Sequence, residues 1–228
     1  MKTIVNHLKN KDVLDSILYP FKSFFYWIIY HFAMRTFLSV ILGVQFDIND
    51  SIEKEEQFIL VANHNSHVDS MALLCSIPSK SLINTCTIAA GDYFGKNKIS
   101  AFFMKMILNA KLIDRNGGGR SVINSLDKLL KRGKSIIIFP EGSRGEPGVL
   151  QDFKLGVAIL LKNNPHIPYI PVYLEDLHKV LPKGDPFIIP HTSKIIMGEV
   201  RRITPDMETE EILVKIKENI MELKQKKN

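Results

Sequence analysis

The sequence predicts one α/β domain with a mixed, largely parallel central sheet flanked by helices, preceded by an N-terminal helical membrane anchor. Three observations lead to this fold class. The 228 residues suffice for one such domain, and 45% hydrophobic with 24% charged residues is a globular composition. From Gln57 onward, short apolar runs alternate with amphipathic stretches, as in βαβ units. Aromatic residues concentrate in the first segment instead. We therefore divide the chain into an anchor, 1–46, and an α/β domain, 47–228.

The anchor segment holds the only tryptophan, Trp27, among many Phe, Tyr and Ile residues. Pro20 indicates a break between a short leading helix and the aromatic helix. His31 and Arg35 interrupt the apolar run, so no clean stretch of about 20 residues predicts a transmembrane span. The segment also lacks the features of a usual signal peptide. We expect one or two helices in the membrane interface, the alternative being an aromatic helical hairpin packed on the domain.

The domain reads as strands and helices in alternation. The expected strands are 58–62, 85–90, 111–113, 136–139, 167–173 and 195–198. The expected helices are 66–76, 99–108, 121–132, 152–163 and 209–223. The run Gly117–Gly119 lacks the Gly-Lys-Ser/Thr of a phosphate loop, so we interpret it as a hinge.

Charge and cysteine content narrow the function classes. A formal net charge of +6 and a pI near 9.2 imply anionic partners. Nucleic acid fits poorly as that partner, because the aromatic residues cluster in one helix rather than interleaving with Lys and Arg on a sheet. Cys75 and Cys86 lie in apolar runs without Cys-x-x-Cys spacing. We expect buried free thiols and a reducing, cytoplasmic-side location.

Residues 63–69, Asn-His-Asn-Ser-His-Val-Asp, directly follow the first expected strand. Loops at the carboxyl ends of strands line the ligand crevice of α/β sheets, so His64 is placed as a reactive imidazole. Asp69 can orient that ring and leave its other nitrogen free to take a proton from a substrate hydroxyl. Two alternatives stay open. Ser66 and Asp69 match a helix-capping box, and His64, His67 and Asp69 are possible metal ligands, although further ligands are not apparent.

Residues 140–144, Pro-Glu-Gly-Ser-Arg, form a charged turn where the expected strand 136–139 ends. The strand-end position aims Glu141 and Arg144 at the same crevice, and the Arg guanidinium suits bidentate phosphate binding. The alternative is a surface ion pair between these two residues. Lys154, just beyond the turn, is either a phosphate or thioester-carrier contact or a solvated helix charge.

Four blocks, in this order, resemble the signature blocks of the glycerolipid acyltransferase family, whose best-known branch is the 1-acylglycerol-3-phosphate acyltransferases. The blocks are 63–69, 112–115 (Leu-Ile-Asp-Arg), 139–144 (Phe-Pro-Glu-Gly-Ser-Arg) and 167–172 (Ile-Pro-Tyr-Ile-Pro-Val). The first and third are specific, whereas the second and fourth are weak alone. Ser143 stands where the family more often has threonine, which keeps the hydroxyl.

The resemblance implies roles for individual residues. His64 is expected to be the general base that removes the acceptor hydroxyl's proton, and Asp69 the carboxylate that orients it. Arg115 is expected to contact the phosphate of the lysophospholipid. The resemblance implies an acceptor-binding turn, with a backbone N–H for the oxyanion, formed by Glu141, Gly142, Ser143 and Arg144.

The expected reaction moves a fatty acyl chain from acyl-CoA or acyl-carrier protein to the free hydroxyl of 1-acylglycerol-3-phosphate, giving phosphatidic acid. A thioester is already activated, so a base, an oxyanion donor and orientation suffice. No Gly-x-Ser-x-Gly elbow is present, which argues against a covalent serine hydrolase. We expect no cofactor and no metal. Alternatives are another lysophospholipid or lyso-aminolipid acceptor, or a non-catalytic membrane-surface binding module.

The expected partners are the two substrates, an anionic lipid surface and, as one donor carrier, acyl carrier protein, with no nucleic acid. The resemblance and the anchor together predict a monotopic protein on the cytoplasmic face of the inner or plasma membrane.

Overall fold

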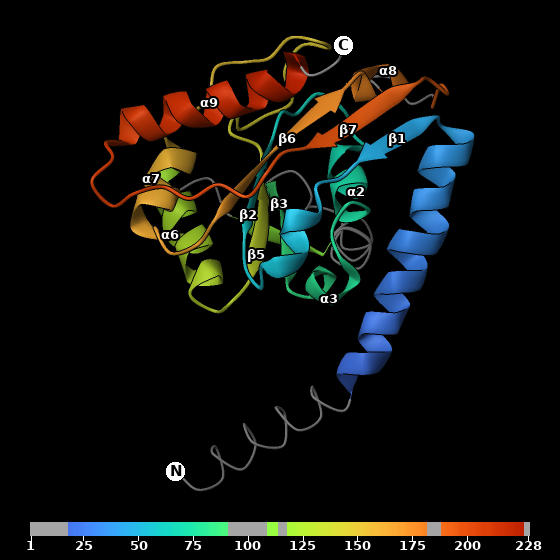
Figure 1. Ribbon diagram of the computed structural model, residues 1–228, viewed down its shortest axis with the longest axis horizontal. Coiled ribbons are helices and arrows are strands. Elements are labelled where there is room, and N and C mark those ends of the chain that lie inside the picture. The colour runs from blue at the N-terminus through green and yellow to red at the C-terminus, as the bar shows by residue number, and fades with distance from the viewer. Residues whose placement is uncertain (1–17, 91–108, 114–117, 182–187, 226–228) are drawn as a thin grey trace, which may run out of the picture.

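The computed structural model describes residues 18–90, 109–113, 118–181 and 188–225. Within these residues, seven strands form one sheet in the order β1-β7-β6-β2-β5-β3-β4, with helices on both faces (Figure 1). The strands are β1 (Val44–Asp47), β2 (Ile59–Ala62), β3 (Thr85–Ala90), β4 (Ala110–Ile113), β5 (Ser135–Ile138), β6 (Tyr169–Glu175) and β7 (Ser193–Met197). The helices of the domain are η3 (Asp50–Lys54), α2 (Asp69–Leu74), α3 (Ser79–Leu82), α6 (Gly118–Leu130), α7 (Gly156–Asn163), α8 (Leu177–Val180) and α9 (Thr209–Gln225).

Strand direction confirms the predicted mixed, largely parallel sheet. Every neighbouring pair is parallel except β6 with β7. Strands β1 and β7 therefore run against the other five. Glu175, at the end of β6, pairs with Lys194 near the start of β7, and Ser193 at the start of β7 pairs with Val44 at the start of β1. Strand β1 therefore begins on the side of the sheet where the carboxyl ends of β2, β5 and β6 lie.

Strand β2 lies at the centre of the sheet and is buried on both faces, which explains its unbroken apolar sequence. Leu60 and Ala62 pack in the cluster that contains α2 and α8 residues. Ile59 and Val61 pack in the cluster formed with α6, α7 and α9. Alternate side chains of β2 thus point into the two hydrophobic layers on opposite faces of the sheet. The loop after Ala62 begins from this buried central strand.

The N-terminal helix, Leu18–Ile41, is continuous over 24 residues and is long and apolar enough, by length and composition alone, to cross a membrane. On that measure the prediction that no stretch is apolar enough is wrong. Pro20 is the third described residue of this helix, and the described helix continues through it without a break. The expected leading helix falls in residues outside the described part of the chain.

One side of the N-terminal helix docks on the domain and the other does not. Tyr30 and Leu38 are buried in the core cluster on the α2 face. Arg35 donates to the carbonyl of Cys75 at 3.4 Å, and its guanidinium lies 4.6 Å from the centre of the Phe46 ring. The helix also has many exposed large apolar side chains, among them Phe21, Phe24, Phe25, Phe32, Val40 and Ile41.

Several expected elements differ from those observed. Strand β1 was not predicted, and it lies across the expected boundary between residues 46 and 47. Gly118 and Gly119 are the first residues of α6, so the hinge prediction is wrong for them, while Gly117 lies outside the described residues. The expected helix 99–108 is also outside them. Both cysteines are buried free thiols, which confirms that expectation.

Candidate active site

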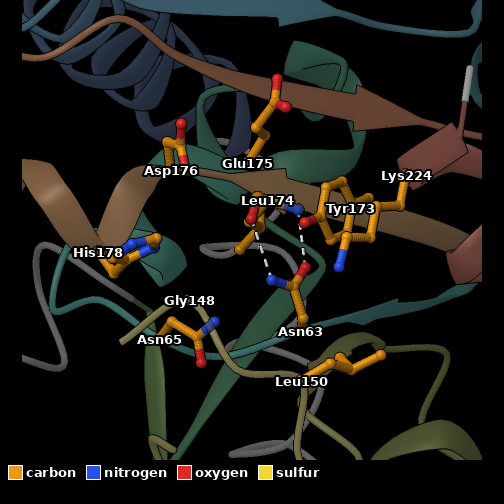
Figure 2. A pocket seen from close by; sticks show the side chains of 10 residues that line it. All are labelled: Asn63, Asn65, Gly148, Leu150, Tyr173, Leu174, Glu175, Asp176, His178 and Lys224. Atoms are coloured by element: carbon orange, nitrogen blue, oxygen red, sulfur yellow. Dashed lines mark hydrogen bonds between the residues drawn. The ribbon is translucent and has the colours of Figure 1, made fainter. Parts of the chain in front are cut away.

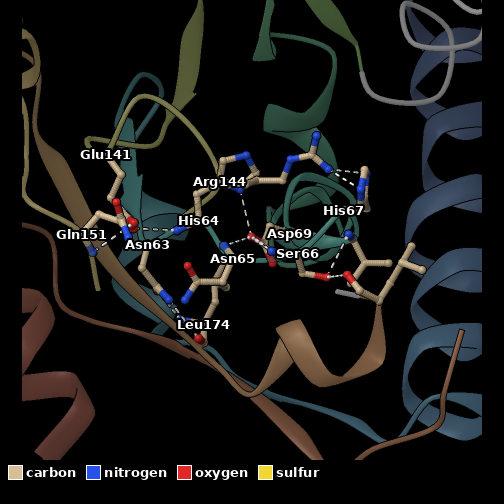
Figure 3. Close-up of polar contacts among 12 residues, drawn as sticks. Asn63, His64, Asn65, Ser66, His67, Asp69, Glu141, Arg144, Gln151 and Leu174 are labelled. Carbon is tan, nitrogen blue, oxygen red and sulfur yellow. Dashed lines mark hydrogen bonds and ion pairs between the residues drawn. The ribbon is translucent and has the colours of Figure 1, made fainter. Parts of the chain in front are cut away.

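The loop between β2 and α2 brings His64 against Asp69. The Nδ1 atom of His64 lies 2.9 Å from Oδ2 of Asp69 (Figure 3). Strand β2 ends just before this loop and α2 begins at Asp69, so the five-residue spacing folds the carboxylate back toward the imidazole. Asp69 is fully buried, whereas the His64 side chain keeps 20% of its surface exposed. The ring is thus held from inside and remains accessible from outside.

One oxygen of Asp69 collects three hydrogen-bond contacts within the loop. Oδ2 accepts the backbone N–H groups of Asn65 and Ser66, each at 2.8 Å, as well as the His64 contact. The bond to the Ser66 N–H is one half of a capping box, but α2 begins at Asp69 and the Ser66 hydroxyl accepts the Val68 N–H instead, so the full box does not form. Because an ionised carboxylate only accepts, Nδ1 of His64 must carry the proton. The other ring nitrogen, Nε2, is then the basic one.

The charged turn after β5 is bonded directly to the His64 loop. Oε1 of Glu141 accepts the backbone N–H of His64 at 2.8 Å, and the His64 carbonyl accepts the N–H of Gly145 at 3.2 Å. The His64 ring also stacks on Phe139, with centroids 3.9 Å apart and planes 15° apart. These contacts are possible because β2 and β5 are adjacent and parallel, so their carboxyl ends meet.

Glu141 is a buried structural carboxylate, which excludes a surface ion pair with Arg144. Its second oxygen accepts the N–H of Gln151 at 3.2 Å. Burial raises the pKa of Glu141, and the two backbone N–H groups act against that rise because they favour the charged form. Glu141 thus connects the charged turn to two other backbone segments, at His64 and at Gln151.

Lys154 is held beside the charged turn and precedes α7, so it is not a helix charge. Its backbone N–H donates to the Pro140 carbonyl at 2.9 Å. Gly142 has φ +76°, and a Cβ at this position would lie 2.8 Å from Nζ of Lys154. Glycine is needed here for its left-handed backbone, and it leaves the room that the ammonium group occupies.

Arg144 contacts the imidazole of His67, so His67 turns toward the charged turn. Burial, followed by the Arg144 charge, lowers the pKa of His67. Within the described ranges, no three His, Cys, Asp or Glu side chains are grouped as a metal site would require. Ser143 is exposed in the turn. Arg115, the expected phosphate contact, lies outside the residues that the structure describes.

Asn63 has a structural role that the sequence did not reveal. Its amide nitrogen donates to the Leu174 carbonyl at 3.0 Å, and its oxygen accepts the Leu174 N–H at 2.7 Å. Ser66 adds a bond from Oγ to the Leu181 carbonyl at 2.9 Å. The His64 loop is therefore fixed to the end of β6 as well as to the turn after β5. Bonds to distant backbone groups leave no pattern in a sequence.

The sequence profile of the Acyltransferase family matches residues 43–175, more than half of the chain. The chain belongs to the Acyltransferase family. This confirms the resemblance that the four blocks suggested. The matched residues, 43–175, include His64, Asp69 and the charged turn.

Similar proteins agree with this assignment. A chloroplastic 1-acyl-sn-glycerol-3-phosphate acyltransferase of Brassica napus is 30% identical over 148 residues, which are 64% of this chain and 39% of that protein. One from Arabidopsis thaliana is 28% identical over 170 residues, or 71% of this chain and 45% of that protein. This acyltransferase-family chain thus spans less than half the length of either relative. The crystal structure of the 1-acyl-sn-glycerophosphate acyltransferase PlsC of Thermotoga maritima shares the fold, with TM-score 0.69, 21% identity and coverage of 100% and 98% of the two chains.

Proposed function

We propose that this protein transfers a fatty acyl group from an acyl thioester to the free hydroxyl of 1-acylglycerol-3-phosphate, forming phosphatidic acid. The observation that carries the proposal is the 2.9 Å contact between His64 Nδ1 and Asp69 Oδ2 beside an accessible ring. The names of the curated relatives support the choice of acceptor.

In the proposed reaction, Nε2 of His64 takes the proton of the acceptor hydroxyl as its oxygen attacks the thioester carbonyl carbon. Asp69 stabilises the imidazolium that forms, as the acid of a triad does, and no covalent acyl-enzyme is needed. The tetrahedral intermediate then expels the thiolate, which takes up the proton. The products are one ester and one free thiol. General-base assistance of this kind contributes about 10²–10⁴-fold.

The acceptor's phosphate is assigned to the cations around the charged turn. Arg144 offers a planar guanidinium and Lys154 a compact ammonium held over Gly142. Arg115 is proposed as a third contact. A backbone N–H of the same turn is proposed to stabilise the oxyanion. Glu141 positions the turn, since both of its oxygens already accept backbone N–H groups.

The N-terminal helix is proposed to hold the enzyme at a lipid surface on the cytoplasmic side. Its exposed aromatic side chains suit the boundary between headgroups and acyl chains, and the net charge of +6 favours anionic lipid. Both the acceptor and the product are lipids, so this location brings the site to its substrate.

We expect His64→Ala to lower acyl transfer by at least roughly 10²-fold, because the base is lost. Asp69→Asn should also lower transfer, because it removes the charge that orients and stabilises the ring. The assay is radiolabelled acyl transfer to 1-acylglycerol-3-phosphate, with circular dichroism to check folding. His166→Ala, an exposed histidine away from the loop, is the matched control. Transfer by His64→Ala within a few-fold of wild type would falsify the mechanism.

The acceptor and donor are tested together by a panel. Wild-type protein should acylate 1-acylglycerol-3-phosphate in preference to lysophosphatidylcholine or a lyso-aminolipid, with coenzyme A and acyl carrier protein thioesters compared as donors. Acylation of lysophosphatidylcholine alone would reject the proposed acceptor and leave the role of His64 standing.

A further inference from the structure

A cavity of about 230 Å³ lies beside the His64 loop, between the carboxyl ends of β2 and β6 (Figure 2). The segment after the charged turn and the end of α9 complete its wall. Its polar lining includes Asn65, Glu175, Asp176, His178 and Lys224. None of these residues has a role in the proton transfer described above.

Asn65 contributes a buried polar side chain to the cavity wall. Its side chain is buried, with 7% of its surface exposed, and its Oδ1 has no hydrogen-bond partner among the described residues. A buried carboxamide is costly unless a partner satisfies it. The backbone N–H of Asn65 shares Oδ2 of Asp69 with His64. The unsatisfied group therefore lies next to the catalytic pair.

The charges of the cavity wall indicate which chemical part of the two substrates could bind there. Glu175 and Asp176 are carboxylates, and burial lowers the pKa of His178, which keeps that ring neutral near pH 7. Lys224 is the one cation that lines the described wall. Asp176 is ion-paired with Lys179 at 3.0 Å, and Glu175 and Lys224 have opposite charges. The wall therefore has no excess of cations to attract a phosphate, and its polar groups disfavour an acyl chain. An uncharged segment rich in amides fits, because its N–H groups donate to the acceptors and its carbonyls pair with the Asn65 amide.

We propose that this cavity binds the amide-bearing pantetheine arm of the thioester donor, the part that coenzyme A and acyl carrier protein share. The proposal rests on the function proposed above. Its volume is below the roughly 300–1,000 Å³ of pockets that enclose whole drug-sized ligands, so it suits a narrow arm rather than an entire carrier. In this arrangement Asn65 orients the arm, and the arm delivers the thioester carbon to the neighbouring His64.

The direct test is equilibrium binding of pantetheine, which carries no acyl group, to the full chain in detergent. Asn65→Leu keeps the side-chain volume and removes its hydrogen bonds, so the Kd should rise roughly 3- to 10-fold. His178→Phe is a second variant on another wall of the cavity and should act in the same direction. Glu218→Gln, on the exposed face of α9, should leave the Kd unchanged.

Kinetics provide the second readout. Asn65→Leu should raise KM for acyl-CoA and for acyl-acyl carrier protein by similar factors, since the arm is common to both, and leave KM for the acceptor unchanged. A rise in the acceptor's KM alone, or equal pantetheine binding by wild type and both variants, would overturn the inference. Acyl transfer without measurable pantetheine binding would overturn the inference and leave the proposed function intact. Pantetheine binding without transfer to any lysolipid would do the reverse.

Discussion

At the scale of single residues, two buried carboxylates hold the candidate site together by accepting several hydrogen bonds each. Oδ2 of Asp69 serves the His64 ring and two backbone N–H groups, and Glu141 serves two more. These bonds fix the loop in the conformation that the proposed reaction requires. Such preorganisation avoids reordering during the reaction.

Gly142 permits a prediction with a matched control. Gly142 and Gly133 have φ of +76° and +73°, but only Gly142 has a neighbour where a Cβ would be placed. Substitution of either by Ala should destabilise the fold by about 1–2 kcal/mol, the cost of a left-handed non-glycine residue. Only Gly142→Ala should also lower acyl transfer, because it displaces Lys154. Thermal unfolding and the transfer assay measure the two effects, and equal activity of both variants would contradict the role of Lys154.

The sequence predicted part of this site and could not predict the rest. His64 and Asp69 are five residues apart at a strand end, so their pairing follows from local geometry. The partners of Glu141 are the backbone N–H groups of His64 and Gln151, and no residue type encodes a backbone N–H. The turn was selected from its charged residues, but its connection to the His64 loop required the pairing of β2 with β5.

At the scale of elements, the N-terminal helix has two different sides. Its buried side includes Tyr30 and Leu38, and Tyr19 additionally donates to the Lys80 carbonyl at 3.3 Å. The opposite side exposes large apolar groups that no part of the described chain covers. The docked side fixes the helix to the domain, and the other side is available to lipid.

A triple substitution on the exposed side tests that division. Phe24, Phe32 and Val40 are 62%, 66% and 73% exposed, so their replacement by Ser should leave the domain folded. Each such apolar side chain contributes about 1.5–3 kcal/mol when fully buried, and vesicle binding should weaken by roughly tenfold or more. Co-sedimentation with anionic vesicles measures the change. Val214→Ser, at an exposed site on α9, is the control, and unchanged sedimentation of the triple variant would refute the lipid contact.

Which elements were predicted depends on length and burial. The central strands have continuous apolar sequences because both of their faces are covered, so β2, β3 and β5 were expected within a residue or two. Strand β1 has four residues with only one of them buried, and α3 and α8 have four residues each. Such short elements are set by tertiary contacts and lack a periodic pattern.

At the scale of the whole molecule, two partly desolvated histidines, His67 and His178, make stability depend on pH. Burial is the largest cause that lowers the pKa of both His67 and His178, with Arg144 adding to the effect on His67 and Asp176 opposing it on His178. Between about pH 7 and pH 5 the unfolded chain therefore binds more protons than the folded one. The free energy of unfolding should decrease as the pH falls through this range.

This effect is measured by the thermal unfolding midpoint at pH 7.5 and pH 5.5. The double variant His67→Gln, His178→Gln should lose less of its midpoint on acidification than wild type does. The pKa of Glu141 is raised above its ordinary value of 4.5, so this residue increases stability as the pH falls toward that value. Both proteins retain Glu141, so its contribution cancels in the comparison. An equal loss in both proteins would show that these two rings do not contribute.

The reversed direction of β1 has a kinetic consequence. Strand β1 begins beside the carboxyl ends of β2, β5 and β6. The N-terminal helix, which precedes β1, therefore joins the sheet on the same side as His64. With that helix in a bilayer, enzyme and acceptor meet by diffusion in two dimensions, and the linkage sets their effective concentration. The velocity should then follow the mole fraction of the acceptor in the membrane rather than its bulk concentration. Diluting the acceptor with inert phospholipid at constant total amount should slow the reaction.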